Sequence, residues 1–143
     1  MDEGITNPTF FQIVDNELKR AERYQIFVSM VILDLTVLRE TAGGSATEVF
    51  GQMFDLVSRS IRVVDQASRI GADKIVLLLP ETSRQGAEMA ARRLSDMIRE
   101  GITRAVADSR VSTIPVEMAS FPDAAGARSV KEVLQEMTHT SMN

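Results

Sequence analysis

The residues with the clearest chemical potential lie in one short stretch, RIGADKIVLLLPET, at residues 69–82. Its pattern predicts a short strand, a turn at residues 71–73 and a second strand at residues 74–79. Asp73 and Lys74 would then stand side by side at the tip of a β-hairpin. A magnesium site needs oxygen ligands and negative charge to offset the dehydration of the ion, whereas Lys74 brings the opposite charge.

Asp34 is a second acid with a candidate role, because it lies near the end of a long apolar run, IFVSMVILDL, at residues 26–35. Such a nearly continuous aliphatic run predicts a central strand that is covered on both faces. Asp34 is then either a metal ligand or an ordinary strand-terminal acid that faces solvent. The second interpretation is favoured, because Asp34 and Asp73 alone make a poor magnesium site.

Helices are predicted around these strands wherever apolar residues recur at helical spacing. The predicted helices cover residues 9–24, a stretch from Ser45 or Thr47 to Val64, residues 83–102 and residues 129–137, with a further strand at residues 111–119. This order predicts an α/β sandwich in which a small, central mixed β-sheet is flanked by helices, with a ferredoxin-like core. No repeat or linker divides the chain, so residues 1–143 are expected to form a single domain.

Composition limits the partners that the chain can have. Its net charge is −4 and its pI is about 5.0, which gives no basic surface for nucleic acid. The absence of cysteine excludes disulfides and thiolate catalysis and fits a cytoplasmic protein. No apolar run reaches the roughly 20 residues of a membrane span, and the polar start MDEGITNP lacks the order of a signal peptide. We therefore expect a cytoplasmic protein that binds neither nucleic acid nor membrane.

The order of elements and several short motifs together resemble the GGDEF family of diguanylate cyclases, which condense two GTP into cyclic di-GMP with two metal ions. The resemblance runs from about Gly4 to Pro122 and includes ELKRAER at residues 17–23, DLT at 34–36, RVVD at 62–65, GADKI at 71–75 and LLPET at 78–82. It implies a GGDEF or nucleotidyl-cyclase-like fold and a role in bacterial signalling. The family's usual C-terminal helix and closing strand are not recognisable after Met137, so that part is expected to be shortened or missing.

The departures from the family pattern fall on its catalytic positions. Gly71 and Asp73 keep the residues of the GGDEF turn, but Ala72 replaces the second glycine and Lys74 replaces the acidic fourth residue. In the family that fourth carboxylate is a metal ligand. Asp34 keeps the first acid of the preceding strand's motif, whereas the second acid is lost. The resemblance therefore implies vestigial catalytic positions at Asp34, Gly71, Asp73 and Lys74, with no metal, no cofactor and no enzymatic activity.

The family's inhibitory product site is a different surface, made by an RxxD motif and an arginine on the helix after the hairpin. Arg62 and Asp65 supply the motif here, and Arg93 falls at the third position. A guanidinium can donate to two acceptors of a guanine edge or a phosphate, and an aspartate can accept from guanine N–H groups. The alternative is a purely structural role, in which Arg62 and Asp65 form a local ion pair at the end of a helix and Arg93 is an ordinary solvent-exposed side chain.

The sequence thus predicts a degenerate GGDEF domain that acts without catalysis, as a regulatory or protein-interaction module. The first alternative is a cyclic di-GMP receptor that uses Arg62, Asp65 and Arg93, and a less favoured alternative is an active diguanylate cyclase. A shortened C-terminal part would leave apolar surface for a protein partner or a second copy to cover.

Overall fold

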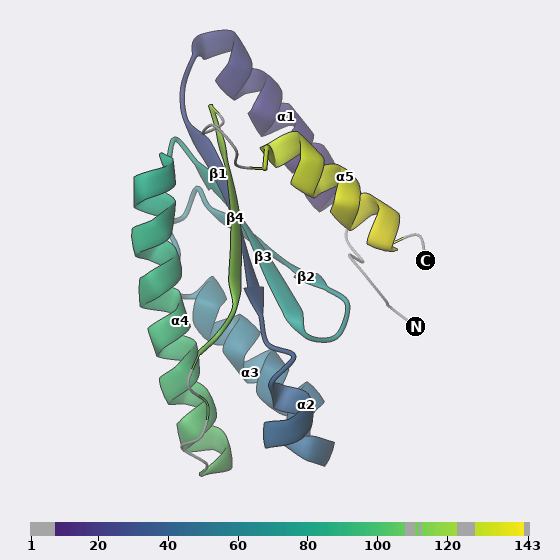
Figure 1. Ribbon diagram of the computed structural model, residues 1–143. Helices are drawn as coiled ribbons and strands as arrows, with labels where there is room; N and C mark the ends of the chain where they lie inside the picture. Colours follow the sequence, from purple (N-terminus) through teal and green to yellow (C-terminus); the bar gives the residue numbers. More distant parts are fainter. Residues whose placement is uncertain (1–7, 108–110, 112, 123–127, 142–143) are drawn as a thin grey trace.

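A four-stranded sheet between two layers of helices forms the fold, in a computed structural model that describes residues 8–107, 111, 113–122 and 128–141 (Figure 1). Helices α1 (Pro8–Tyr24) and α5 (Val130–Ser141) lie on one face of the sheet. Helices α3 (Ala46–Ser58) and α4 (Arg84–Val106) cover the other face, and the short helices α2 (Leu38–Thr41) and η1 (Gly43–Ser45) lead into α3. The strands are β1 (Val28–Asp34), β2 (Gln66–Ile70), β3 (Lys74–Pro80) and β4 (Val116–Phe121).

The sheet has the strand order β2-β3-β1-β4, and the three pairings in it are antiparallel. The predicted α/β sandwich with a ferredoxin-like core is confirmed, but the sheet is not mixed. The reason is the split βαβ connection, in which each helical crossover skips one strand. Helix α3 connects β1 to β2 across β3, and α4 connects β3 to β4 across β1, so strands that run in the same direction are never neighbours.

Two apolar cores lie on opposite faces of the sheet, because successive side chains of a strand point to opposite faces. In β1, Val31 and Leu33 pack on the α3 and α4 side, whereas Met30 and Ile32 pack on the α1 and α5 side. Strand β1 is buried on both faces up to Asp34, as its continuous apolar run predicts. The β1–β3 register pairs Asp34 with Lys74, so the charged end of β1 and the β2–β3 turn lie at the same end of the sheet.

Helix α3 ends at Ser58, well before the predicted end at Val64. Val63 is wholly exposed and Val64 is 57% exposed, so these two valines do not continue the apolar face that the sequence suggested. The chain turns because the Asp65 carboxylate accepts a hydrogen bond from the Arg62 backbone N–H at 2.9 Å. The Arg62 to Asp65 segment is consequently a turn in the loop before β2 and not the last turn of a helix.

The region before β4 also differs from the prediction of a strand at residues 111–119. Val111 and Ile114 are buried in the core beneath α4, but the strand begins only at Val116. Pro115 has no N–H to donate to the ladder, although its carbonyl accepts from the backbone N–H of Asp34 at 3.0 Å. The apolar pattern therefore predicted the burial of Val111 and Ile114 correctly, but it wrongly predicted that they belong to the strand.

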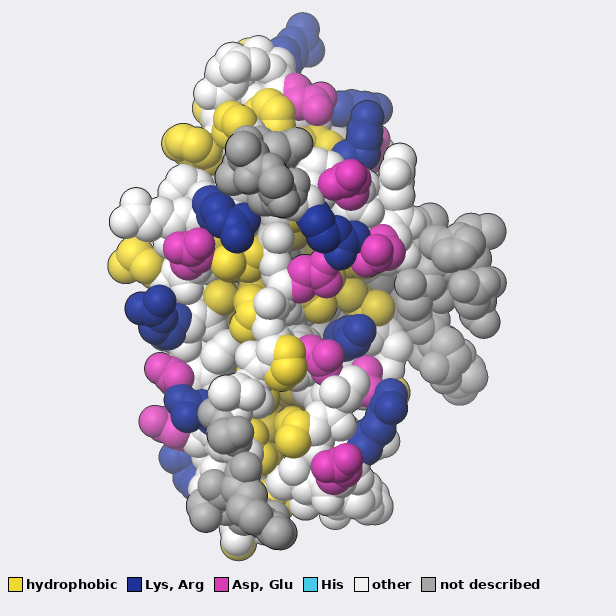
Figure 2. Space-filling view, viewed as in Figure 1, with side chains coloured by type: hydrophobic (Ala, Val, Ile, Leu, Met, Phe, Trp, Pro, Cys, Tyr) yellow, Lys and Arg dark blue, Asp and Glu magenta, His cyan; other side chains and the backbone are white. Residues whose placement is uncertain are grey.

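The face of the molecule in Figure 2 carries a strip of hydrophobic side chains down its middle, with charged side chains on either side. Strand β4, which is an edge strand, runs down the middle of the same view in Figure 1. Val116 at the start of β4 is 39% exposed. The helices in the described part of the chain all lack the combination of length and hydropathy that a membrane span requires.

Candidate functional site

Arg62, Asp65 and Arg93 line one open pocket with a volume of about 370 Å³. The loop between α3 and β2 supplies the first two residues, and the first turns of α4 supply the third. The remaining lining residues come from the end of β3, the β3–α4 loop and the start of α4, and they are Leu79, Glu81, Thr82, Ser83, Gly86 and Ala90. The fold therefore brings the three predicted binding residues together, and their role in binding a ligand stays a prediction.

Asp65 holds one edge of the Arg62 guanidinium. The Nη2 of Arg62 donates to Asp65 Oδ1 at 2.8 Å, and Nε donates to Oδ2 at 3.1 Å, so the pair is bidentate. The Asp65 side chain is only 4% exposed, whereas the Arg62 side chain is 54% exposed. Oδ2 also accepts from the Arg62 backbone N–H, and Oδ1 also accepts from Nε, so both carboxylate oxygens are engaged by Arg62 and Asp65 acts by fixing that residue.

The β3–α4 loop is the second anchor of Arg62. Its Nη2 also donates to the Pro80 carbonyl at 2.9 Å and to Thr82 Oγ1 at 2.7 Å. The hydrogen bonds to Asp65 raise the pKa of Arg62 above its ordinary value, against the lowering effect of burial, and the charge of Asp65 and then of Glu81 adds to the rise. Arg62 is therefore a permanently charged, preorganised cation at the rim of the pocket.

Buried hydroxyl groups of the sheet hold the β3–α4 loop in place. Ser29 Oγ donates to the Thr82 carbonyl at 2.7 Å, and it lies 2.8 Å from Ser120 Oγ. Ser29 is fully buried on β1, and Ser120 on β4 is 4% exposed. At the other end of the loop, Ser83 caps α4 by accepting from the Gly86 backbone N–H at 3.2 Å. The sheet thus holds the loop that Arg62 binds.

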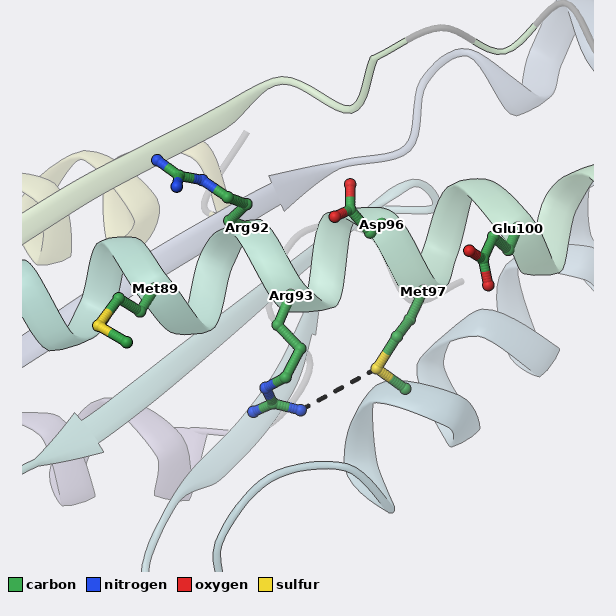
Figure 3. A pocket seen from close by; sticks show the side chains of 6 residues that line it. All are labelled: Met89, Arg92, Arg93, Asp96, Met97 and Glu100. Atoms are coloured by element: carbon green, nitrogen blue, oxygen red, sulfur yellow. Dashed lines mark hydrogen bonds between the residues drawn. The ribbon is translucent and has the colours of Figure 1, made fainter.

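Arg93 is the second arginine that lines the pocket, and it approaches the pocket from α4. Its Nη1 donates to the Ser60 carbonyl at 3.2 Å and lies 4.0 Å from the sulfur of Met97. Figure 3 shows Arg93 and Met97 on the same side of the helix, with Arg92 extending from the opposite side. Arg93 also borders a second cavity of about 480 Å³ on the outer face of α4, which Figure 3 displays. Of the two neighbouring arginines, only Arg93 lines the pocket of Arg62.

The tip of the hairpin is a separate cluster of charges. Asp34 and Lys74 are register partners across β1 and β3, and Asp34 Oδ1 accepts from the Thr36 backbone N–H at 2.8 Å. The Asp73 carboxylate accepts from Arg39 Nη2 at 2.5 Å. Gly71 takes a positive φ of 62° at the turn, a conformation that a side chain would disfavour.

These contacts bear on the two metal ions that the family resemblance implies. Asp73 is already paired with Arg39, and the Lys74 side chain stands opposite Asp34 in the ladder. Within the described ranges, no group of three or more His, Cys, Asp or Glu side chains is placed to hold a metal ion. The donor set at the hairpin tip does not fit a pair of divalent ions.

Sequence reasoning missed three residues of these two clusters. Arg39 was not identified, because its partner Asp73 lies far away in the sequence and only the β1–β3 register brings the two together. Glu81 and Thr82 were not assigned to the pocket, although both belong to the LLPET motif. Their position directly after the buried strand β3 was the available signal, because binding residues often follow a strand end.

Comparison with known proteins gives a family for the fold and the motifs. Residues 4–140 match the family model described as "Diguanylate cyclase, GGDEF domain". A curated relative, diguanylate cyclase DgcS of Shewanella oneidensis, is 33% identical over 84 residues, which are 53% of this chain and 27% of that protein. The chain therefore spans about a quarter of the length of that relative.

Solved structures show the same fold at low sequence identity. The active GGEEF domain of a diguanylate cyclase from Vibrio cholerae aligns with a TM-score of 0.63 at 14% identity, over 97% of this chain and 88% of that one. The GGDEF domain of DgcB from Caulobacter crescentus, solved in complex with c-di-GMP, aligns with a TM-score of 0.61 at 14% identity, over 93% of this chain and 80% of that one.

These findings confirm the GGDEF resemblance and correct one prediction that was drawn from it. The prediction that the chain is not an enzyme is contradicted, because the matching family model and the curated relative are both described as diguanylate cyclases. The error came from treating replacements at the family's catalytic positions, in the GGDEF turn and after Asp34, as decisive for the activity of the whole domain.

Proposed function

The chain belongs to the GGDEF family of diguanylate cyclase domains, and from that premise we propose that it binds cyclic di-GMP in the pocket lined by Arg62, Asp65 and Arg93. The observation that carries the proposal is the meeting of these three side chains, from two segments far apart in the sequence, around one pocket. Binding there would make the domain a regulatory element of bacterial signalling that responds to the second messenger.

The chemistry of the pocket suits a ligand with phosphates and guanine edges. Two guanidinium groups at the rim supply positive charge and paired N–H donors, which phosphates and the acceptor edge of guanine both use. Arg62 has its Nε and Nη2 edge occupied by Asp65, so its Nη1 side is the part that would meet a ligand. Arg93 binds Ser60 through Nη1 alone, so its Nε and Nη2 donors complement those of Arg62.

Isothermal titration calorimetry of the chain with cyclic di-GMP tests the proposal. Saturable binding is expected, with a loss of at least about tenfold in affinity for Arg62→Ala or Arg93→Ala. The matched control is Arg92→Ala, because Arg92 has the same charge at the preceding position of α4, extends from the opposite side of the helix to Arg93 (Figure 3) and does not line the pocket of Arg62. Wild-type affinity in Arg93→Ala, or an equal loss in Arg92→Ala, would reject the assigned site.

A parallel titration with GTP and Mg²⁺ separates this site from the hairpin tip. Binding of cyclic di-GMP alone, lost in Arg62→Ala and kept in Lys74→Ala, supports the pocket as the site. If instead Lys74→Ala abolishes binding of cyclic di-GMP while Arg62→Ala keeps it, the ligand binds at the hairpin tip and the proposal is wrong.

A second candidate function, contact with another copy of the chain, is favoured by the hydrophobic strip over the edge strand β4 (Figure 2). Edge strands with exposed apolar side chains are ready sites for association. Sedimentation equilibrium of the chain is expected to show a dimer that Val116→Lys weakens, since Val116 is exposed and lies on that strand. A monomer at high protein concentration would exclude this candidate.

A further inference from the structure

Glu81 is an acidic residue in a pocket that is otherwise suited to an anion. It lines the pocket of Arg62 and Arg93, and its side chain is 65% exposed. Its backbone has a φ of 51°, in the left-handed region that residues other than glycine seldom adopt. A carboxylate at this position would repel a phosphate and would compete with it for the two arginines.

The backbone on both sides of Glu81 is fixed, so only the side chain is free to change its position. Arg62 Nη2 binds the Pro80 carbonyl before it and Thr82 Oγ1 after it. The Thr82 carbonyl is in turn held by the buried Ser29 hydroxyl. The direction that the Glu81 carboxylate takes is therefore decided by side-chain partners.

Arg20 is that partner, and it belongs to helix α1. Its Nη2 donates to Glu81 Oε2 at 2.9 Å and to Glu17 Oε2 at 3.1 Å, and its Nε donates to Glu17 Oε1 at 3.3 Å. The hydrogen bonds that Arg20 donates to Glu17 and then to Glu81 raise the pKa of Arg20 above its ordinary value. Glu17 is 16% exposed, so it orients the Arg20 guanidinium from a semi-buried position on the same helix.

We infer that Arg20 is a positioning residue for the anion pocket, which acts by holding the Glu81 carboxylate on the α1 side, away from Arg62 and Arg93. Without Arg20, the carboxylate would turn to the two arginines that line the same pocket and would occupy their donors as an internal competitor. Because α1 carries Arg20, a displacement of α1 relative to β3 would change the affinity of the pocket. The inference rests on the proposed cyclic di-GMP site.

A double-mutant cycle tests this mechanism with cyclic di-GMP as the probe. Arg20→Ala is expected to lower the affinity about tenfold, which is a typical coupling for residues in one network. Glu81→Gln is expected to bind at least as tightly as wild type, because the competitor loses its charge. The double variant is expected to match Glu81→Gln, because Arg20 has no role once the carboxylate is gone.

Lys19→Ala is the matched control. Lys19 is the neighbouring cation on α1 and forms a comparable surface ion pair with Asp15 at 3.1 Å, but neither residue lines the pocket. The affinity of Lys19→Ala for cyclic di-GMP is expected to equal that of wild type. A loss in Lys19→Ala as large as in Arg20→Ala would mean that helix charge alone is responsible, which would overturn the inference.

Two further results would overturn it. One is an unchanged affinity in Arg20→Ala, and the other is an equal loss in the double variant, which would mean that Arg20 contacts the ligand directly. The NMR resonance of the Arg62 Nε proton, measured without ligand, is expected to shift in Arg20→Ala and to return toward its wild-type position in the double variant. Absence of cyclic di-GMP binding by wild type would reject the proposed function alone, since the ligand-free resonance still decides whether Arg20 restrains Glu81.

Discussion

Replacement of Asp65 by alanine should destabilise the fold more than replacement of its partner Arg62. Asp65 is nearly buried and accepts the Arg62 backbone N–H as well as the guanidinium. Loss of a hydrogen bond to a charged acceptor costs about 1.5 to 3 kcal/mol. The ion pair adds at most about 1 kcal/mol, because Arg62 is more than half exposed and its charge is screened by solvent.

The sum predicts a loss of about 3 kcal/mol in the free energy of unfolding for Asp65→Ala. At about 3 °C per kcal/mol for a domain of this size, the Tm should fall by about 10 °C. Arg62→Ala should cost only about 1 kcal/mol, because the Asp65 carboxylate keeps its backbone hydrogen bond and water replaces the exposed guanidinium.

Urea denaturation followed by circular dichroism measures both changes, with Asp65→Asn as a third protein. The asparagine keeps an oxygen for the Arg62 N–H and loses the charge, so its stability should lie between those of wild type and Asp65→Ala. Equal losses in Asp65→Ala and Arg62→Ala would refute the view that Asp65 serves the turn as well as the ion pair. A loss below about 1 kcal/mol in Asp65→Ala would refute the estimate itself.

Two other predictions concern helix packing and pH. Gly51→Ala should stabilise the chain by about 0.5 to 1 kcal/mol in thermal unfolding, because Gly51 is inside α3 and an added Cβ would meet nothing within 4 Å. Gly101→Ala should gain less or lose stability, because its Cβ would lie 2.8 Å from the sulfur of Met53, and an equal gain at both sites would contradict this packing argument. Because Asp65 raises the pKa of Arg62, the folded state retains this charge, and its contribution to stability is lost only as the pH rises through that elevated pKa. Cyclic di-GMP affinity should therefore be constant from about pH 6 to about pH 9 by calorimetry, and a fall within this window would assign the anion contact to another group.

The fold was predictable where one short segment contained its own signal. The apolar runs of β1 and β3, the serine before α4 and the glycine at the hairpin turn each specify an element locally. The end of α3 was not predictable in this way, because Val63 and Val64 continue the helical apolar period while lying outside the core. The deciding contact was the turn closed by Asp65, which the hydrophobic period does not report.

Three of the four charged residues that line the pocket were predictable from their motif spacing, whereas Glu81 and the neighbour that orients it were not. Arg20 and Glu81 are 61 positions apart in the sequence, and they meet only because α1 packs beside the end of β3. Arg39 and Asp73 are 34 positions apart and meet through the β1–β3 register. Such pairs depend on the tertiary fold, so one sequence gives no local pattern for them.

The motif itself takes on a different meaning in the structure. An RxxD spacing was expected to place an arginine and an aspartate against a ligand, yet the nearly buried Asp65 has both oxygens committed to Arg62. The acid therefore contributes by fixing the cation before the ligand arrives, which reduces the conformational entropy lost on binding. The same logic applies to Glu17, which holds Arg20, which holds Glu81. On each side of the pocket an acid with little solvent exposure thus orients an arginine, and these two acids should be less tolerant of substitution than residues that only line the surface.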